Sequence, residues 1–94
     1  MNKYETVLIM KENITEEIKN KVINKITDYL NTNGEVTKIE DIGLRKLAYE
    51  IKKNKKGYYY VIEFDAKPES IIELERMYRI NDEIIKFIVI RKDN

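Results

Sequence analysis

Few side chains in this sequence could carry out acid–base or metal chemistry. The chain contains no histidine and no cysteine, so it lacks the commonest general base, the commonest metal ligand and any thiolate. Glu63 and Asp65 are two positions apart in an apolar run, and on a strand they would share one face as a carboxylate pair. Carboxylates at the solvated end of a strand are common without any such role. We therefore expect no catalytic residue, no metal site and no cofactor.

Tyrosines offer a second kind of chemistry, because their rings can stack on nucleic-acid bases. Three of them follow Lys56-Gly57 in the stretch Lys56–Asp65, whose aromatic and β-branched residues are typical of a strand. One face of this strand would be wholly apolar and is predicted to lie in the core: Tyr58, Tyr60, Ile62 and Phe64. The other face would be apolar where it begins and acidic where it ends: Tyr59, Val61, Glu63 and Asp65.

The beginning of this stretch is close to the pattern of an RNA-recognition strand, Lys/Arg-Gly-aromatic-Gly/Ala-Phe-Val-x-Phe/Tyr. It departs at Tyr59, where a small residue is expected, and at Glu63, where an aromatic residue is expected. In that motif Tyr58 and Tyr60 would point outward, and Glu63 and Asp65 would be buried without partners. Because burying two carboxylates costs more than exposing two tyrosines gains, the tyrosines are predicted to be core unless a bulge changes the phase.

Composition limits the class of protein. The 94 residues suit one domain, residues 1–94, and 43% apolar with 37% charged content is typical of a soluble globular chain. No apolar run is long enough to span a membrane and the N-terminus lacks a signal-peptide core, so a reducing, cytosolic setting is expected. Because the net charge is only +1, any binding of nucleic acid must use local basic patches or a more basic partner.

Hydrophobic periodicity predicts two helices and four strands. One helix opens at Asn13–Glu17 and closes at Asn33-Gly34 with a left-handed glycine; the other runs from Lys67-Pro68-Glu69 to Asn81-Asp82. The strands are Tyr4–Met10, Glu35–Lys53 with a β-bulge at Gly43, Lys56–Asp65 and Glu83–Lys92. The turn between the second and third strands is predicted over Lys52–Gly57.

The order β-α-β-β-α-β predicts an α+β fold, the ferredoxin-like sandwich, in which two helices cover one face of a four-stranded antiparallel sheet. Right-handed crossovers place the first and third strands in the centre, the fourth beside the first, and the second at the other edge. Small acylphosphatase enzymes share this fold class. No glycine-rich phosphate cradle with an arginine is visible here, so an enzyme is only the third choice.

The face of the sheet without helices is predicted to be an apolar patch. The helices would cover the side that carries Leu8, Ile62, Phe64, Phe87 and Val89, and alternation along the last strand puts Ile85 in the same phase as Phe87. The opposite side would gather apolar side chains from three neighbouring strands, and nothing else in the sequence is expected to cover them: Val7, Ile9, Tyr59, Val61, Ile88 and Ile90. Because a contiguous patch usually marks an interface, these residues are predicted to bind a partner.

Several runs of residues are distinctive as sequence. The most specific is Gly43-Leu44-Arg45-Lys46-Leu47-Ala48-Tyr49, and shorter ones are Tyr4-Glu5, Gly57-Tyr58-Tyr59, Leu74-Glu75-Arg76, Arg79-Ile80 and Ile85-Lys86-Phe87. With these runs the whole chain resembles the bacterial small-subunit ribosomal protein S6 family. The resemblance implies a non-enzymatic protein that binds small-subunit ribosomal RNA and forms a heterodimer with ribosomal protein S18 in the platform of the subunit.

The chain departs from the family pattern at two places. Glu50 stands where many members have proline. The sequence also ends at Asn94 without the acidic tail that some members carry, so no modification of such a tail is expected.

Basic side chains are predicted to meet RNA phosphates at two places. Lys3, Arg91 and Lys92 should come together because the first and fourth strands are antiparallel, although solvated termini would look the same. Arg45 and Lys46 lie on an edge strand, where charge also guards against aggregation, and the resemblance favours an RNA contact. The remaining lysines near the turn are expected to be solvated first and RNA contacts second: Lys52, Lys53, Lys55 and Lys56.

The sequence thus predicts a cytoplasmic structural protein of the small ribosomal subunit, bound to ribosomal RNA together with protein S18. The alternative is a free-standing RNA-recognition module that stacks bases on Tyr58 and Tyr60.

Overall fold

Six elements make up the chain in the computed structural model, which describes residues 1–92. The strands are β1 (Asn2–Lys11), β2 (Gly34–Ile51), β3 (Asn54–Ala66) and β4 (Ile84–Lys92), and the helices are α1 (Glu16–Asn33) and α2 (Ser70–Ile80). Their number and order confirm the prediction. The expectation about a tail at Asn94 lies outside the described residues.

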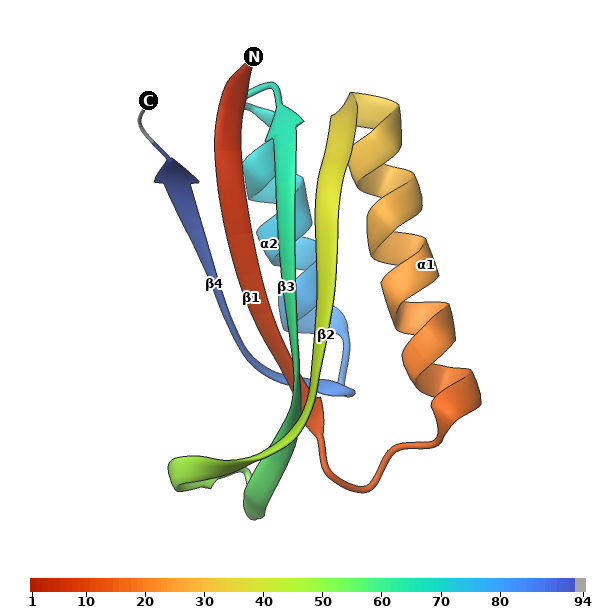
Figure 1. Ribbon diagram of the computed structural model, residues 1–94, viewed down its shortest axis with the longest axis vertical. Helices are drawn as coiled ribbons and strands as arrows, with labels where there is room; N and C mark the ends of the chain where they lie inside the picture. The colour runs from red at the N-terminus through yellow and green to blue at the C-terminus, as the bar shows by residue number, and fades with distance from the viewer. Residues whose placement is uncertain (93–94) are drawn as a thin grey trace.

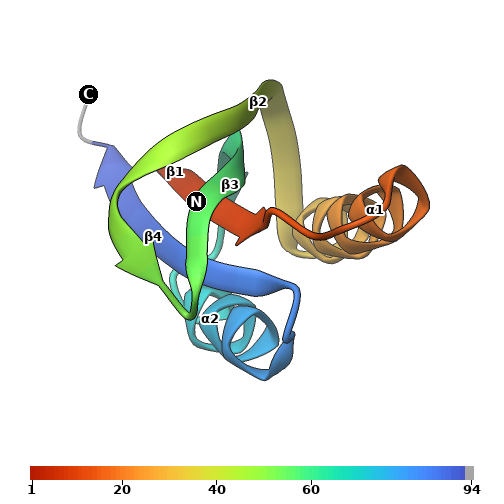
Figure 2. The same cartoon turned by 90° about the horizontal axis from the view of Figure 1, so that it is seen from below.

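The four strands form one antiparallel sheet in the order β2-β3-β1-β4, as predicted. Figures 1 and 2 show α1 beside β2 and α2 beside β4, and buried side chains of both helices share one core with the sheet. This arrangement is the ferredoxin-like fold. No helix within residues 1–92 covers the other face of the sheet.

The core confirms the predicted phase of β3, in which Tyr58 and Tyr60 point toward the helices and not toward a bound base. Tyr60, Ile62 and Phe64 of β3 are buried, as is Leu8 of β1. Tyr58 is half-buried and packs against the same cluster. The opposite phase of β3 therefore faces away from the helices, as alternation along a strand requires.

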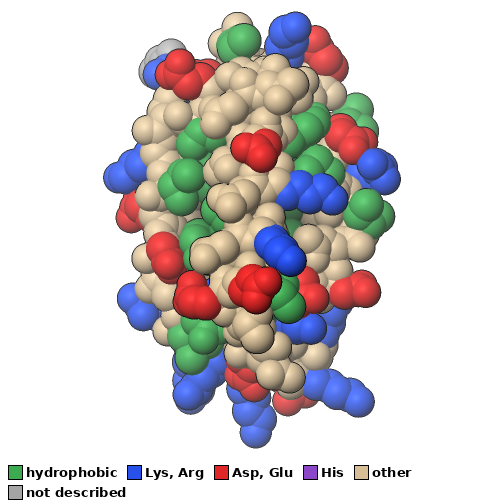
Figure 3. All heavy atoms as spheres, turned by 90° about the vertical axis from the view of Figure 1, so that its right-hand side faces the viewer, with side chains coloured by type: hydrophobic (Ala, Val, Ile, Leu, Met, Phe, Trp, Pro, Cys, Tyr) green, Lys and Arg blue, Asp and Glu red, His purple; other side chains and the backbone are tan. Residues whose placement is uncertain are grey.

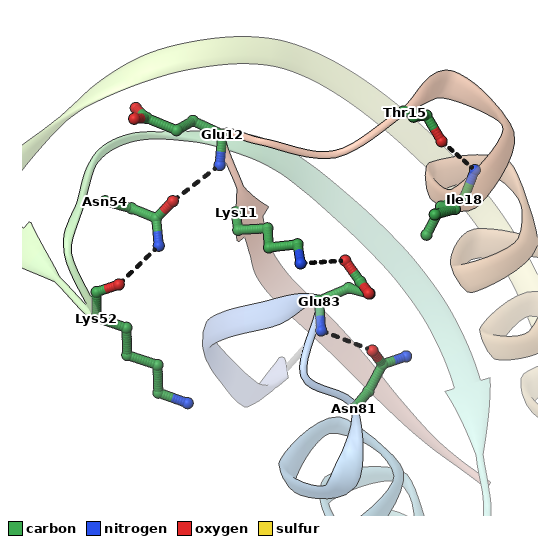
Figure 4. Close-up of polar contacts among 8 residues, drawn as sticks. All are labelled: Lys11, Glu12, Thr15, Ile18, Lys52, Asn54, Asn81 and Glu83. Carbon is green, nitrogen blue, oxygen red and sulfur yellow. Dashed lines mark hydrogen bonds and ion pairs between the residues drawn. The ribbon is translucent and has the colours of Figure 1, made fainter.

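The two ends of α1 depend on different residues. Thr15 is the N-cap, and its Oγ1 accepts a hydrogen bond of 3.2 Å from the Ile18 N–H (Figure 4). Gly34 does not adopt the predicted left-handed conformation, because its φ is 172° and it already begins β2. Glycine is required there for space: a Cβ would overlap the carbonyl oxygen of Asp65 on β3.

The longest strand, β2, ends in a hairpin that reaches beyond the rest of the sheet (Figure 1). The predicted bulge at Gly43 is confirmed by a φ of 89° and a shift in register. The turn is shorter than predicted: Lys52 and Lys53 alone form it, both with positive φ, and Ile51 pairs with Asn54. β3 consequently begins earlier than the prediction placed it.

A shift in register between β1 and β4 corrects one predicted face. The shift lies between Ile9 and Met10 of β1 and leaves one extra residue on β4. Ile84 therefore packs in the main core, whereas Ile85 points to the other face of the sheet. The prediction that Ile85 shares a face with Phe87 is wrong, because strict alternation does not hold through a bulge.

The residues around α2 are fixed by local hydrogen bonds. The Lys67 carbonyl accepts the backbone N–H of Ser70 at 3.0 Å and its hydroxyl at 2.6 Å, so the predicted helix start forms a turn just before α2. After α2, Asn81 Oδ1 accepts the Glu83 N–H at 2.9 Å, and Lys11 Nζ lies 3.1 Å from Glu83 Oε2 (Figure 4). These contacts fix where β4 begins beside β1.

Candidate partner and nucleic-acid interface

The face of the sheet without helices brings most of the predicted apolar patch together. β1 lies between β3 and β4, so Val7 pairs with Val61 on one side and with Ile88 on the other. Val7, Tyr59 and Val61 are half-buried, whereas Ile88 and Ile90 are 47% and 48% exposed. Because these side chains continue one another across three strands, they form a single surface, here called the open face.

The sixth predicted residue, Ile9, is covered by the chain itself. It is 6% exposed and belongs to a second, small core with Leu47 and Ile85. Leu47 reaches it because the β2–β3 hairpin curls over this end of the sheet (Figure 2). The expectation that nothing in the chain covers this face is therefore wrong at the hairpin end.

Tyr49 extends this cover toward β4. The Nζ of Lys86 donates a hydrogen bond of 3.0 Å to the Tyr49 hydroxyl and lies 5.3 Å from the centre of its ring. A shallow hollow of about 210 Å³ lies beside this contact, lined by Val7, Ile9, Tyr59, Lys86, Phe87 and Ile88. Its largely apolar lining suits an aliphatic or aromatic side chain of a partner.

Carboxylates border the open face at its other end. Glu5 and Glu63 pair directly across β1 and β3, and Glu5 also pairs with Ile90 of β4. Like charges in directly opposed positions repel each other. The sequence indicated Glu63 at this place but missed Glu5, whose neighbours follow only from the register of the strands.

The predicted basic corner forms, but acidic side chains share it. Lys3 pairs with Lys92 where β1 begins and β4 ends, and Arg91 is the next residue along β4. All three line an open hollow of about 490 Å³ together with the carboxylates of Glu35 and Asp65. The corner is therefore a mixed surface rather than a purely basic one.

Within this corner Lys92 is already paired. Its Nζ lies 2.9 Å from Oε1 of Glu63, and their hydrogen bond lowers the pKa of Glu63 and raises the pKa of Lys92. Among the described residues, Lys3 and Arg91 form no ion pair, and Arg91 donates a hydrogen bond of 3.3 Å to Asn2 Oδ1. A phosphate would meet these two cations without first breaking an ion pair.

The other predicted RNA contacts lie at the opposite end of the molecule. Arg45 and Lys46 are exposed on β2, where they pair in register with Gly57 and Lys56 of β3. In Figure 1 this hairpin is at the bottom and the N-terminus is at the top. The structure therefore does not join the predicted basic residues into one site but divides them between two.

The tyrosines of the alternative RNA-recognition reading face the helices. Tyr60 is 5% exposed, and its hydroxyl donates a hydrogen bond of 3.3 Å to Asp41 Oδ2. The Nζ of Lys19 lies 3.8 Å from the centre of the Tyr58 ring and 2.8 Å from Glu16 Oε1. Neither ring is free to receive a base, so base stacking on this pair is not supported.

The described residues offer surfaces rather than a reactive centre. Across residues 1–92 there is no group of three carboxylates arranged as a metal site, and no helix is long and apolar enough to cross a membrane. Fold and surfaces together define a class: a ferredoxin-like α+β domain whose sheet presents an apolar face, with a mixed charged corner at one end and exposed basic side chains at the other. The chain belongs to the ribosomal protein S6 family, whose sequence model matches residues 3–91.

Individual relatives agree with this membership. The chain is 50% identical to small ribosomal subunit protein bS6 of Helicobacter hepaticus, over all of this chain and 69% of that protein. It is 48% identical to bS6 of Helicobacter acinonychis, over all of this chain and 67% of that protein. The crystal structure of 30S ribosomal protein S6 from Thermotoga maritima matches with a TM-score of 0.92 at 34% identity, covering 97% of this chain and 87% of that one.

Family membership confirms several predictions together. The chain is a structural protein of the small ribosomal subunit, acts in the cytoplasm with the ribosome, and is not an enzyme.

Proposed function

We propose that this chain binds small-subunit ribosomal RNA as a heterodimer with ribosomal protein S18, in the platform of the subunit. The family resemblance supplies the partner, and one observation supports the surface: Ile88 and Ile90 are half-exposed on a sheet face that no helix within residues 1–92 covers. A contiguous apolar surface of this kind usually marks an interface. The carboxylate of Glu5 beside it suits a partner that is more basic than this chain.

The RNA contacts in this proposal act by charge on phosphates and do not read bases. Lys3, Arg91 and Lys92 would serve at one end of the sheet, and Arg45 and Lys46 at the other. Since the whole chain has a net charge of only +1, the RNA-binding surface is expected to be small or to be shared with a more basic partner protein.

Reconstitution tests both parts of the proposal. The chain should sediment with a particle assembled from small-subunit RNA and the other small-subunit proteins. Leaving out protein S18 should abolish this incorporation. Incorporation that does not depend on S18, or no incorporation at all, would contradict the heterodimer.

A charge-reversal variant tests the corner separately. Lys3→Glu with Arg91→Glu should weaken incorporation and reduce its salt dependence, because contacts to phosphate release counterions. The matched control is Lys21→Glu with Lys25→Glu, which reverses two exposed lysines on α1. Equal behaviour of the two variants would remove the corner from the RNA-binding surface.

A further inference from the structure

The strongest unassigned feature is the concentration of positive charge on the β2–β3 hairpin. Residues 44–57 contain six basic side chains and one carboxylate, although the whole chain has a net charge of +1. The rest of the chain is therefore net acidic. We call these side chains the basic finger: Arg45, Lys46, Lys52, Lys53, Lys55 and Lys56. Figure 3 shows Lys and Arg side chains gathered at the lower end of the molecule, where the hairpin lies in Figure 1.

The charges of the finger are not neutralised within the part of the chain that the structure describes. All six side chains are exposed. None of the ion pairs among residues 1–92 includes any of them. By contrast, Lys92 at the other end of the sheet is paired with Glu63. The finger is thus the larger of the two groups of basic side chains, and all six of its cations are free to take up anions.

Hydrogen bonds and one apolar contact fix the position of the finger on the rest of the fold. Glu12, just after β1, forms two hydrogen bonds with the hairpin. Its N–H donates to Asn54 Oδ1 at 3.1 Å (Figure 4), and its Oε2 accepts the Lys56 N–H at 3.0 Å. Asn54 Nδ2 in turn donates to the Lys52 carbonyl at 3.1 Å (Figure 4). Leu47 anchors the base of the hairpin on Ile9. A fixed surface loses less conformational entropy on binding than a flexible one.

The turn keeps lysines where other residues would be more stable. Lys52 and Lys53 have φ values of 48° and 67°, a conformation that favours Asn-Gly in two-residue hairpins and is strained for lysine. Lys46 and Lys56 also pair directly across the strands and repel each other. A turn that only reverses the chain needs neither the strained backbone of two lysines nor the repulsion between two paired lysines. Backbone strain of this kind is concentrated at functional sites.

We propose that the basic finger binds the phosphate backbone of ribosomal RNA, with Lys52, Lys53, Lys55 and Lys56 as its main contacts. This inference rests on the proposed function, and it moves the main RNA contact from the corner at Lys3 to the hairpin. The contacts are sequence-independent, because the four main side chains are lysines, whose point charges on flexible stems pair with phosphate and do not read base edges. Since the hairpin packs on Ile9 beside the open face, RNA on the finger would lie close to the bound partner protein.

The test removes charge from the finger without weakening the fold. Lys52→Asn with Lys53→Gly replaces the strained pair by the residues that the turn favours, so the melting temperature should stay the same or rise. Lys55→Gln with Lys56→Gln removes two charges on β3 as a second variant. Binding of the S18 heterodimer to small-subunit RNA and to a short RNA duplex of arbitrary sequence is then measured across a salt series.

Each double variant should weaken binding to both RNAs and lower the slope of log K against log salt by about two, close to one for each lost phosphate contact. Lys21→Gln with Lys25→Gln on α1 is the matched control and should leave the slope unchanged. Unchanged slopes for both hairpin variants would overturn the proposal that the basic finger binds RNA phosphates. If Lys3→Glu with Arg91→Glu lowered the slope in that case, the proposal that the chain binds RNA would hold, and only the proposal that the finger makes the contacts would be wrong.

Discussion

At the residue scale, the buried hydroxyl of Thr6 takes part in two hydrogen bonds within the core. Thr6 is fully buried, and its Oγ1 donates to the Ile88 carbonyl at 3.0 Å. Its single proton is thereby used, so the Tyr78 hydroxyl at 3.1 Å must be the donor of the second hydrogen bond. Burial raises the pKa of Tyr78, although the hydrogen bond with Thr6 lowers it in part. The tyrosine therefore remains a protonated donor that needs this acceptor.

Thr6→Val should consequently destabilise the fold by about 1–3 kcal/mol, because it leaves the Tyr78 hydroxyl buried without an acceptor. Urea denaturation gives the free energy of unfolding. Thr37→Val is the matched control: its hydroxyl donates to the Glu63 carbonyl at 3.0 Å from an exposed position, and water replaces that bond. An equal loss in both variants would contradict the buried network.

The ion pair between Glu63 and Lys92 should make the stability of the fold depend on pH. The hydrogen bond and charge of Lys92 lower the pKa of Glu63 from its ordinary value of 4.5. A carboxyl group whose pKa is lower in the folded state stabilises the fold above its unfolded pKa, and this stabilisation is lost as pH falls through the folded pKa. The stability difference between the wild type and Glu63→Gln should therefore shrink as the pH falls below about 4.5. Denaturation across a pH series measures it, and a difference that grows toward acid would contradict the pairing.

Residue positions on a face were predictable only where alternation is unbroken. Tyr60, Ile62 and Phe64 follow the period of a strand and lie where the pattern placed them. Ile85 does not, because one inserted residue at the bulge reverses its side. Glu5 was missed as a neighbour of Glu63, since two residues far apart in sequence meet only through the strand register.

At the element scale, the β2–β3 hairpin is the part that sequence reasoning described least well. Both strands, Gly43 and the edge position of β2 were predictable from alternation and from right-handed crossovers. The curl of the hairpin over the sheet was not, because it comes from the accumulated twist and register shifts of a long strand. Leu47 therefore covers Ile9, a contact between residues that no local pattern connects.

Leu47→Ala should detach this hairpin. Leu47 is 6% exposed in a small cluster, so a loss of about 2–3 kcal/mol is expected, at the low end for a buried leucine. Amide hydrogen exchange should become faster in residues 46–56 while the core of β1 and β3 stays protected. Leu44→Ala makes the same chemical change at a position that is 40% exposed and should have little effect. Faster exchange spread evenly over the sheet would show that the hairpin is not a separate unit.

At the scale of the whole molecule, one layer of helices leaves a sheet with two unlike faces. The inner face is filled by the helices, and the outer face has an apolar centre covered at one end by the hairpin. Positive charge is concentrated on that hairpin, and carboxylates border the other end of the patch. Such a molecule is suited to being held between a protein partner and RNA.

The most direct test of the central claim, that the open face binds the partner, is calorimetric titration with ribosomal protein S18. Ile88→Asp with Ile90→Asp changes two half-exposed side chains on edge strand β4, so the monomer should remain folded. Full burial of an isoleucine is worth about 1.5–3 kcal/mol, so completing the burial of these two half-exposed side chains is worth about that much in total, and we expect affinity to fall by at least roughly tenfold. Ile72→Asp with Ile80→Asp, exposed on α2, should bind like the wild type. Wild-type affinity in the β4 variant would contradict the claim.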